Sequence, residues 1–305
     1  MESTPQNPTL FQAWWMAIRP RTLPASIAGV VMGISVTWLE GKFDLLPALA
    51  ALFIGILLQI GSNLANDVYD FHRGADTPDR LGPTRVTTAG ILTPRQVKTG
   101  MLVVFGTAAL LGFYLFLHSG WWVLLIGISA ILSAILYTGG PYPLGYHGLG
   151  DLFVFIFFGL AAVCGTYFAQ VGRVSTIAWW MAIPVGLIVV DLLVVNNLRD
   201  INTDRAVGKR TMAVRIGAKW TKVEYIALMV IAFLMIPAGI LLHLIPPISL
   251  LVFLSIPRAW YICRLVLTTT GRSLNKALAA TSQFALIYST FFLLSILIGK
   301  AAALI

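Results

Sequence analysis

Charged residues are scarce in this sequence. They make up 11% of its 305 residues, whereas hydrophobic residues make up 58%. A soluble globular domain carries about 25% charged residues. The composition therefore excludes an ordinary soluble protein and indicates a protein whose partner is the lipid bilayer.

Cysteine and histidine are scarce as well. The two cysteines, Cys164 and Cys263, both fall within apolar stretches, which argues against a disulfide framework and a cysteine metal site. His147 has no second histidine at ligand spacing, so we do not expect it to bind metal. The first ten residues, MESTPQNPTL, lack a basic region before an apolar core, and we expect no cleavable signal peptide.

Long apolar runs, by contrast, recur along the whole chain. A run of ~20 residues is enough to cross the ~30 Å hydrocarbon core as a helix. The sequence predicts an all-α integral membrane protein with about nine transmembrane helices. The expected spans are residues 22–39, 45–65, 97–117, 121–138, 149–170, 176–197, 223–243, 247–267 and 283–304.

The basic residues are distributed unevenly between the two sides of these spans. With the N-terminus in the cytoplasm, only Lys42, Arg173 and Lys300 of the 21 Lys and Arg residues fall on the outer side, as the positive-inside rule expects. This orientation places residues 66–96, 139–148, 198–222 and 268–282 in the cytoplasm. The net charge of +9 is then mostly topogenic, and we expect no nucleic-acid partner.

The acidic residues gather in the two longest polar connections, residues 66–96 and 198–222. The first contains NDVYDFHRGAD, and the motif NNLRDINTD runs from the end of the preceding span into the second. Asn66 and Asp70 are echoed by Asn196 and Asp200, 130 residues later, which is a weak internal repeat. The aspartates of the two connections are Asp67, Asp70, Asp76, Asp79, Asp200 and Asp204.

On a helix, the polar residues of each motif would share one face. Asn197, Asp200 and Asp204 fall within ~60° of one another, and Asn63, Asn66, Asp67 and Asp70 within ~100°. Gly74 and Pro78 then end the first helix, so we expect Asp76 in the loop. Carboxylates one turn apart repel, and the arrangement needs a cation. Carboxylate and amide oxygens suit Mg²⁺ or Ca²⁺.

Basic residues follow both acidic motifs. Arg73 follows the first, and Lys209 and Arg210 follow the second. A pure cation site would not need them, whereas a Mg²⁺–diphosphate site would. A diphosphate site that opens onto a lipidic cavity favours an isoprenyl diphosphate as substrate. The alternative interpretation is a solvated, topogenic loop.

The connection YTGGPYPLGYHGLGD offers Tyr137, Tyr142 and Tyr146 on a Gly/Pro-rich hinge. These rings could form a lid or a wall that stabilises an allylic cation, and an interfacial aromatic belt explains them equally well. Asp151 begins the fifth span and is a candidate polar contact or base. Asp191 lies on the opposite side of its helix from Asp200 and Asp204, and we expect it to pair with another helix.

The motifs NDVYDFHRGAD and NNLRDINTD resemble those of the UbiA superfamily of intramembrane aromatic prenyltransferases, over essentially the whole chain. Within it, AIRPRTLPASIAGVVMG, DRLGPTR and GKRTMAVRIG are most similar to the MenA branch, the 1,4-dihydroxy-2-naphthoate polyprenyltransferases. The resemblance implies nine helices around a central cavity in a bacterial cytoplasmic membrane. It also implies Mg²⁺-dependent transfer of a polyprenyl group from polyprenyl diphosphate to 1,4-dihydroxy-2-naphthoate, with decarboxylation, to give demethylmenaquinone.

The resemblance also assigns residues by motif position. The metal ligands it implies are Asn66, Asp67, Asp70 and Asp76 in the first motif, and Asn197, Asp200 and Asp204 in the second. It implies diphosphate contacts from Arg73, Lys209 and Arg210. Arg21 in RPRTLP is a hypothetical ligand of the acceptor carboxylate, or else a topogenic charge. Two alternatives stay open: a relative with another aromatic or lipid acceptor, and a cation-coupled transporter.

Overall fold

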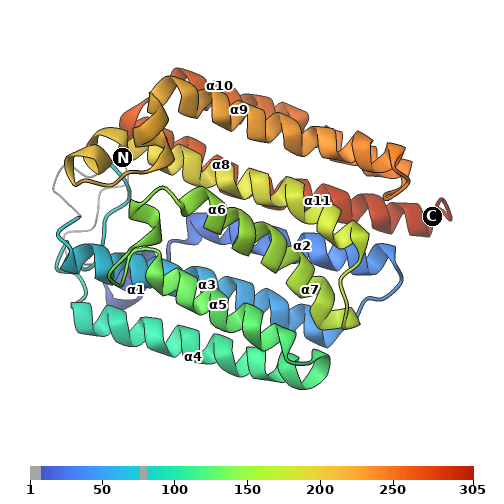
Figure 1. The fold of residues 1–305 in the computed structure, drawn as a ribbon, viewed down its shortest axis with the longest axis horizontal. Helices are drawn as coiled ribbons and strands as arrows, with labels where there is room; N and C mark the ends of the chain where they lie inside the picture. The colour runs from blue at the N-terminus through green and yellow to red at the C-terminus, as the bar shows by residue number, and fades with distance from the viewer. Residues whose placement is uncertain (1–7, 76–80) are drawn as a thin grey trace.

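The computed structural model describes residues 8–75 and 81–305, and all regular elements within these ranges are helices (Figure 1). Eight helical segments are long and apolar enough to cross a membrane, and α5 is a shorter apolar helix of 15 residues. The prediction of an all-α membrane protein with about nine spans is confirmed. The elements are α1 (Leu10–Ile18), η1 (Pro20–Thr22), α2 (Leu23–Leu39), α3 (Leu45–His72), α4 (Pro94–Ser119), α5 (Trp122–Leu136), η2 (Leu144–Tyr146), α6 (Gly150–Val154), η3 (Phe155–Ala161), α7 (Ala162–Val171), α8 (Thr176–Ala206), α9 (Met212–Leu241), η4 (Pro247–Ser255), α10 (Ile256–Thr268), η5 (Gly271–Ser273) and α11 (Leu274–Ala301).

Several helices extend well past the predicted apolar spans. The prediction ends at residue 65 for α3 and at residue 197 for α8, but these helices continue to His72 and Ala206. Likewise α11 begins at Leu274 rather than near residue 283. The added turns are polar and therefore invisible to a hydropathy criterion. Both acidic motifs consequently lie on helix ends, as the one-face pattern predicts.

The fifth span is not a continuous α-helix. It consists of α6, the π-helical segment η3 and α7. A π segment widens the helix and is frequently found next to a functional site. Here Gly159 of η3 lies so close to α8 that an added Cβ would be 2.7 Å from the Gly186 Cα.

Small residues also bring α2 against the fifth span. A Cβ on Gly29 would lie 2.6 Å from the Phe158 carbonyl oxygen, and a Cβ on Gly33 would lie 2.7 Å from that of Val163. Two small residues four apart let helices approach closely in a membrane, where lipid removes the hydrophobic drive between helices. The GVVMG sequence of α2 therefore positions this helix against η3 and α7.

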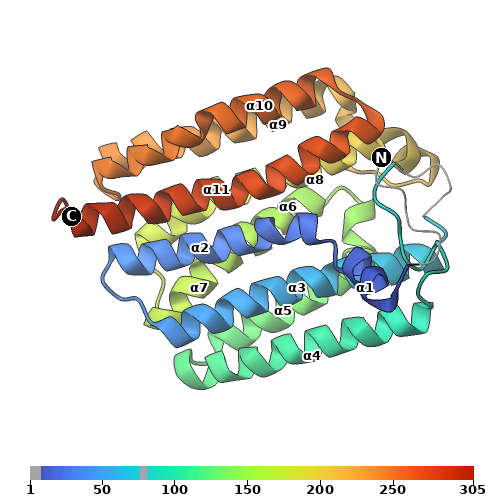
Figure 2. The same cartoon turned by 180° about the vertical axis from the view of Figure 1, so that it is seen from behind.

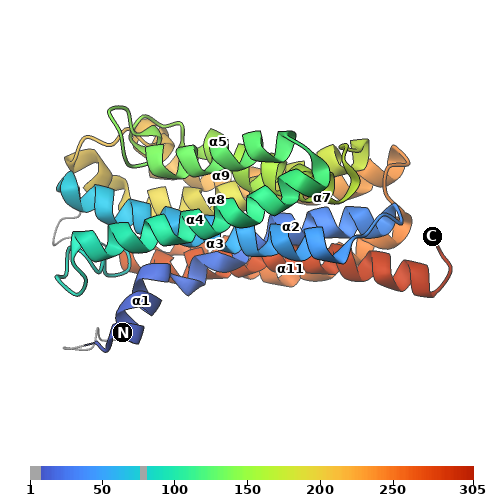
Figure 3. The same ribbon diagram turned by 90° about the horizontal axis from the view of Figure 1, so that it is seen from below.

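The polar connections meet at one end of the bundle, which we call the motif end (left in Figure 1). Arg73 Nε donates to the Thr138 carbonyl at 2.9 Å, and Asn275 Nδ2 donates to the Leu81 carbonyl at 2.9 Å. The C-terminus lies at the opposite end (Figure 3), where Lys42 pairs with Glu40 at 2.7 Å. The segments predicted to share a membrane side are thus together at the motif end.

Candidate active site

The first acidic motif forms the end of α3, where Asp67 and Asp70 are 1% and 2% exposed. Asp67 Oδ2 and Oδ1 accept hydrogen bonds from the backbone N–H groups of Val86 (3.3 Å) and Thr87 (3.1 Å). Arg19 Nη2 lies 4.0 Å from Asp67 Oδ2. The connection between α3 and α4 therefore folds back over the motif and holds Asp67 in place.

Asp70 joins three separate parts of the chain. Its Oδ2 accepts from Arg85 Nη2 at 2.8 Å, and its Oδ1 accepts from the Tyr146 hydroxyl at 2.9 Å. Arg85 is itself only 6% exposed. A charge-assisted bond of this kind is strong because it is shielded from water. Asp70 thus lies at the junction of α3, the connection after it and the loop that ends in η2.

In the second motif, Arg199 holds its sequence neighbour Asp200. Arg199 Nε donates to Asp200 Oδ1 at 2.8 Å and Nη2 to Oδ2 at 2.5 Å. The remaining guanidinium N–H groups are held by Asn275 Oδ1 (2.7 Å) and Asn196 Oδ1 (2.8 Å). This bidentate grip fixes the rotamer of the Asp200 carboxylate.

Lys209 connects the two motifs. Its Nζ lies 3.9 Å from Asp70 Oδ1 and 3.9 Å from Asp204 Oδ1. The same ammonium lies 4.5 Å from the centre of the Tyr146 ring, a cation–π contact. The two acidic motifs, from α3 and α8, therefore share the Lys209 ammonium.

These residues match a divalent cation in the kind of ligand they offer. Carboxylate and amide oxygens are the donors that Mg²⁺ prefers, and the place of Lys209 shows that a cation is stabilised between the motifs. Asn66 Oδ1 accepts from Thr138 Oγ1 at 3.0 Å, and Asn197 is 7% exposed. In residues 8–75 and 81–305, no three acidic, histidine or cysteine side chains converge on one point. Asp76 and Asp79 lie outside the described residues.

The basic residues singled out by the sequence occupy different surroundings. The Arg73 guanidinium donates to the carbonyls of Thr138 and Gly140 and lies 5.6 Å from the Tyr146 ring centre, so it anchors the loop. Arg210 is exposed, and its backbone N–H binds the Tyr146 carbonyl. Arg21 lines a separate groove with Arg258.

The aromatic residues of the hinge also divide. Tyr142 is 57% exposed and stacks on His147, with ring centres 3.5 Å apart. Tyr137 lines an apolar cavity, and Tyr146 binds Asp70. Of the three tyrosines, Tyr137 and Tyr146 face the centre of the protein and Tyr142 faces outward.

Asp151 and Asp191 are buried carboxylates with no hydrogen-bond partner among the described residues. Asp151 follows Gly150, where an added Cβ would lie 2.8 Å from the Tyr137 hydroxyl oxygen. The expected pairing of Asp191 with another helix is wrong for the described residues. Its acidic neighbour Glu224 is no counter-charge, and the nearby Tyr225 hydroxyl binds Thr281 instead.

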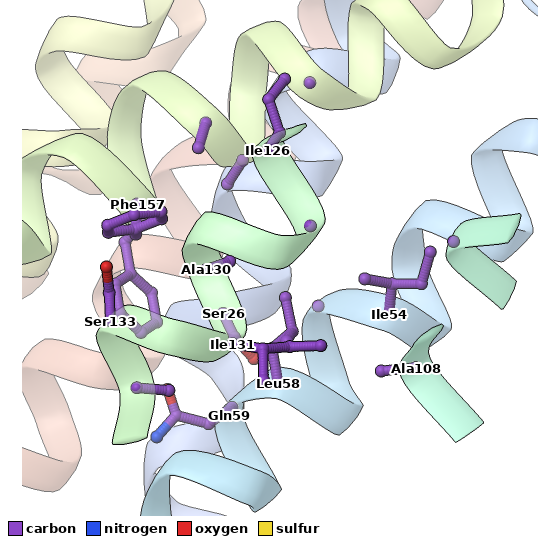
Figure 4. Close-up of a pocket in the computed structure, with 18 of the residues that line it drawn as sticks. Ser26, Ile54, Leu58, Gln59, Ala108, Ile126, Ala130, Ile131, Ser133 and Phe157 are labelled. Carbon is purple, nitrogen blue, oxygen red and sulfur yellow. The ribbon is translucent and has the colours of Figure 1, made fainter. Parts of the chain in front are cut away.

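An apolar cavity of about 230 Å³ lies between α2, α3, α4, α5, η3 and α7. Ile54 and Leu58 of α3, Ile126 and Ile131 of α5, and Phe157 of η3 surround it (Figure 4). The α5 part of the wall runs from Val123 to Tyr137, which corresponds to about 21 Å of helix rise. Tyr137 and Gln59 bring polar groups to its motif end. The cavity has the shape and polarity of a pocket for an apolar chain.

The model of the UbiA prenyltransferase family matches residues 26–298 of this sequence. The chain belongs to this family. Its membership makes it a prenyltransferase, and it agrees with the two acidic motifs and the cavity between the helices. Membership of this enzyme family therefore excludes assignment of the chain to a transporter family.

Curated relatives of this UbiA protein are named 1,4-dihydroxy-2-naphthoate octaprenyltransferase. The protein of Mycobacterium tuberculosis (strain H37Rv) is 43% identical over 73% of this chain and 76% of its own length. That of Escherichia coli K12 is 40% identical over 70% and 71%. That of Haemophilus influenzae is 35% identical over 94% and 96%.

Solved structures share the fold at lower identity. The apo UbiA homolog from Aeropyrum pernix K1 superposes with a TM-score of 0.69 at 17% identity, covering 91% of this chain and 97% of that one. A UbiA homolog from Archaeoglobus fulgidus bound to GPP and Mg²⁺ gives a TM-score of 0.66 at 14% identity, covering 93% and 99%. These likenesses support the nine-span fold.

Several residues of the site were not singled out by the sequence reasoning. They bind the acidic motifs from elsewhere in the chain or from between motif residues. Arg85 lies in DRLGPTR and Arg199 within NNLRD, so a search for basic residues inside the motifs could have found both. No sequence signal points to Asn275. These residues are Arg19, Arg85, Arg199 and Asn275.

Proposed function

We propose that this protein transfers a polyprenyl group from polyprenyl diphosphate to 1,4-dihydroxy-2-naphthoate, with loss of the carboxylate, to form demethylmenaquinol, the reduced form of demethylmenaquinone. One observation carries the proposal: the motifs of α3 and α8 meet around Lys209, and Tyr137 lies between them and an apolar cavity. The names and identities of the curated relatives support the choice of acceptor.

We propose that the acidic motifs hold Mg²⁺. The first motif would contribute Asn66, Asp67, Asp70 and Asp76, and the second Asn197, Asp200 and Asp204. Bound Mg²⁺ would neutralise charge on the diphosphate and stabilise it as a leaving group. The Archaeoglobus fulgidus homolog was solved with GPP and Mg²⁺, which supports this ligand pair for the family.

The basic residues of this chain would hold the diphosphate oxygens. Lys209 already lies between the motifs, and Arg73 and Arg210 flank it on the same end of the bundle. Arg199 would keep Asp200 in one orientation, which avoids reorganisation when substrate binds. Diphosphate bound by these groups places the polyprenyl chain toward the apolar cavity.

The remaining residues would act on the reacting carbons. Departure of diphosphate leaves an allylic cation, which the faces of Tyr137 and Tyr146 can stabilise. The ring carbon that bears the carboxylate would form the new bond to this cation. Its bond to the carboxylate would then break, releasing carbon dioxide and returning the electron pair to the aromatic ring. Asp151 would accept a hydrogen bond from an acceptor hydroxyl, which makes the ring more electron-rich.

We further propose that the motif end faces the cytoplasm of a bacterial cell, with the protein in the cytoplasmic membrane. The excess of Lys and Arg at this end supports the orientation. The bacterial relatives support the compartment.

Incubation of the purified protein with Mg²⁺, dihydroxynaphthoate and a polyprenyl diphosphate tests the proposal. Mass spectrometry of the lipid extract should detect the prenylated, decarboxylated naphthalene. Asp44→Asn, at the far end of the bundle, is a matched control that should form the same product. Faster prenylation of 4-hydroxybenzoate or homogentisate would contradict the acceptor but not the prenyl transfer.

A further inference from the structure

A second cavity opens at the surface between η1, α10 and α11. Its volume is about 410 Å³, and Arg21, Arg258 and Lys276 all line it. None of the described residues that line it is acidic. α10 and α11 run side by side on the face shown in Figure 2. We call this feature the basic groove.

Arg258 lies deep within a membrane span. It is ten residues before the end of α10 at Thr268, or about 15 Å of helix rise. Its neighbours Leu254 and Trp260 are 64% and 72% exposed, as expected for a helix that faces lipid. A charged side chain at this depth is costly and points to a functional site.

The groove does not neutralise this charge with its own residues. Arg258 Nη2 donates to Gln283 Oε1 at 3.3 Å, and the guanidinium lies 5.5 Å from the Tyr261 ring centre. Its Nε is buried without a hydrogen-bond partner in the described part of the chain. No carboxylate of residues 8–75 or 81–305 forms an ion pair with it. Neutral partners thus orient the guanidinium and leave its charge for an outside anion.

We propose that the basic groove binds the phosphate of an anionic phospholipid. Arg258 would hold two phosphate oxygens with its fork of donors, while Lys276 and Arg21 add charge nearer the membrane surface. The acyl chains would run from Arg258 toward the bilayer centre, along the exposed side chains of Leu254 and Leu250. Basic pockets between transmembrane helices recognise anionic lipid headgroups in this way.

The groove also touches the second acidic motif through one side chain. Asn275 lines the groove and accepts a hydrogen bond from Arg199 Nη1, and Arg199 holds Asp200. A lipid headgroup in the groove would therefore lie beside the residue that orients Arg199. We expect bound anionic lipid to order this part of the second motif.

Native mass spectrometry of the purified full chain tests the proposal with phosphatidylglycerol and phosphatidylcholine as probes. The wild-type protein should retain one phosphatidylglycerol at least about five-fold more tightly than phosphatidylcholine, given three basic residues in the groove. Arg258→Gln should abolish the preference. Arg264→Gln removes the same charge from the same helix at an exposed position outside the groove, and should keep it.

Several outcomes would overturn the proposal. One is equal retention of both lipids, and another is an equal loss of preference in Arg258→Gln and Arg264→Gln, which would indicate general surface charge. Displacement of phosphatidylglycerol by dihydroxynaphthoate would assign the groove to the acceptor. Displacement by inorganic phosphate at similar concentration would show an anion site that does not recognise the rest of the lipid. If Arg258→Gln does not fold, as judged by its unfolding temperature, Lys276→Gln carries the same comparison.

Discussion

Asp70 of α3 and Asp204 of α8, 134 residues apart in the chain, each lie 3.9 Å from the ammonium of Lys209. Their contact with one cation makes the two motifs a single site. It also gives Lys209 a definite role before substrate arrives, because it offsets the repulsion between two buried carboxylates. Under the proposed function, this ammonium would turn toward the phosphate oxygens once diphosphate is bound.

Lys209→Gln should lower turnover strongly. The change removes the charge between the motifs, and loss of one preorganised electrostatic contact typically costs ~10²–10³-fold. Initial rates at saturating substrates measure the effect. Lys219→Gln, an exposed lysine on α9, is the control and should keep the wild-type rate. Equal rates in both variants would contradict a role for Lys209 in binding the diphosphate donor.

Replacement of one motif carboxylate by an amide should also lower turnover by ~10²–10³-fold. Asp70→Asn and Asp200→Asn test one residue in each motif, and Asp67→Asn and Asp204→Asn a second. Chelation of divalent metal by EDTA should abolish activity, and added Mg²⁺ should restore it. Near-normal activity in Asp70→Asn together with Asp200→Asn would contradict the paired-motif site.

Arg199→Lys should weaken the response to Mg²⁺ rather than abolish product formation. Lysine cannot reproduce the bidentate grip on Asp200, and loss of such an orienting partner costs about 10–100-fold in metal affinity. The concentration of Mg²⁺ that gives half-maximal activity should therefore rise, while the KM for the acceptor stays constant. Arg205→Lys, exposed on the same helix, should leave both unchanged. A shift in the acceptor KM alone would argue against this role.

Gly127→Leu should select against long donors. Gly127 lines the apolar cavity with no atom within 4 Å of an added Cβ, so leucine can enter the space without a clash. The ratio of kcat/KM for a long to a short polyprenyl diphosphate should fall roughly ten-fold or more. Gly106→Leu is matched to it, because its surroundings are equally open but it does not line the cavity. A similar fall in Gly106→Leu would show that the cavity does not select the length of the prenyl chain.

Cysteine labelling should place the motif end in the cytoplasm. Ala89→Cys and Ala206→Cys are exposed at that end, and Ala302→Cys is exposed at the far end. A membrane-impermeant thiol reagent added to intact cells should label only Ala302→Cys. Cell lysis should then expose the other two positions. Labelling of Ala89→Cys and Ala206→Cys from opposite sides would be incompatible with one shared site.

The fold and the acidic motifs could be predicted because they follow local rules. Apolar runs give the spans, and the spacing of Asp200 and Asp204 gives one helix face. The pairings of the site could not be predicted in this way. Arg85 reaches Asp70 only because its connection folds back, and Asn275 reaches Arg199 from another helix, 76 residues away.

The position of Arg21 in the structure could not be predicted from the sequence either. In the sequence, Arg21 of RPRTLP is a candidate ligand of the acceptor carboxylate or a topogenic charge. In the structure Arg19 has a positive φ of 56° and turns toward Asp67, while Arg21 lines the basic groove. Arg19 and Arg21 are only two residues apart, but the backbone turn at Arg19 directs their side chains to different sites. The sequence composition does not predict this turn.

The release of carbon dioxide from carboxyl-labelled dihydroxynaphthoate, measured together with diphosphate release by the wild-type protein, tests the proposed reaction most directly. We predict equal amounts of both products, each dependent on Mg²⁺ and on the polyprenyl donor. Diphosphate release without carbon dioxide, or a prenylated product that keeps its carboxylate, would contradict it.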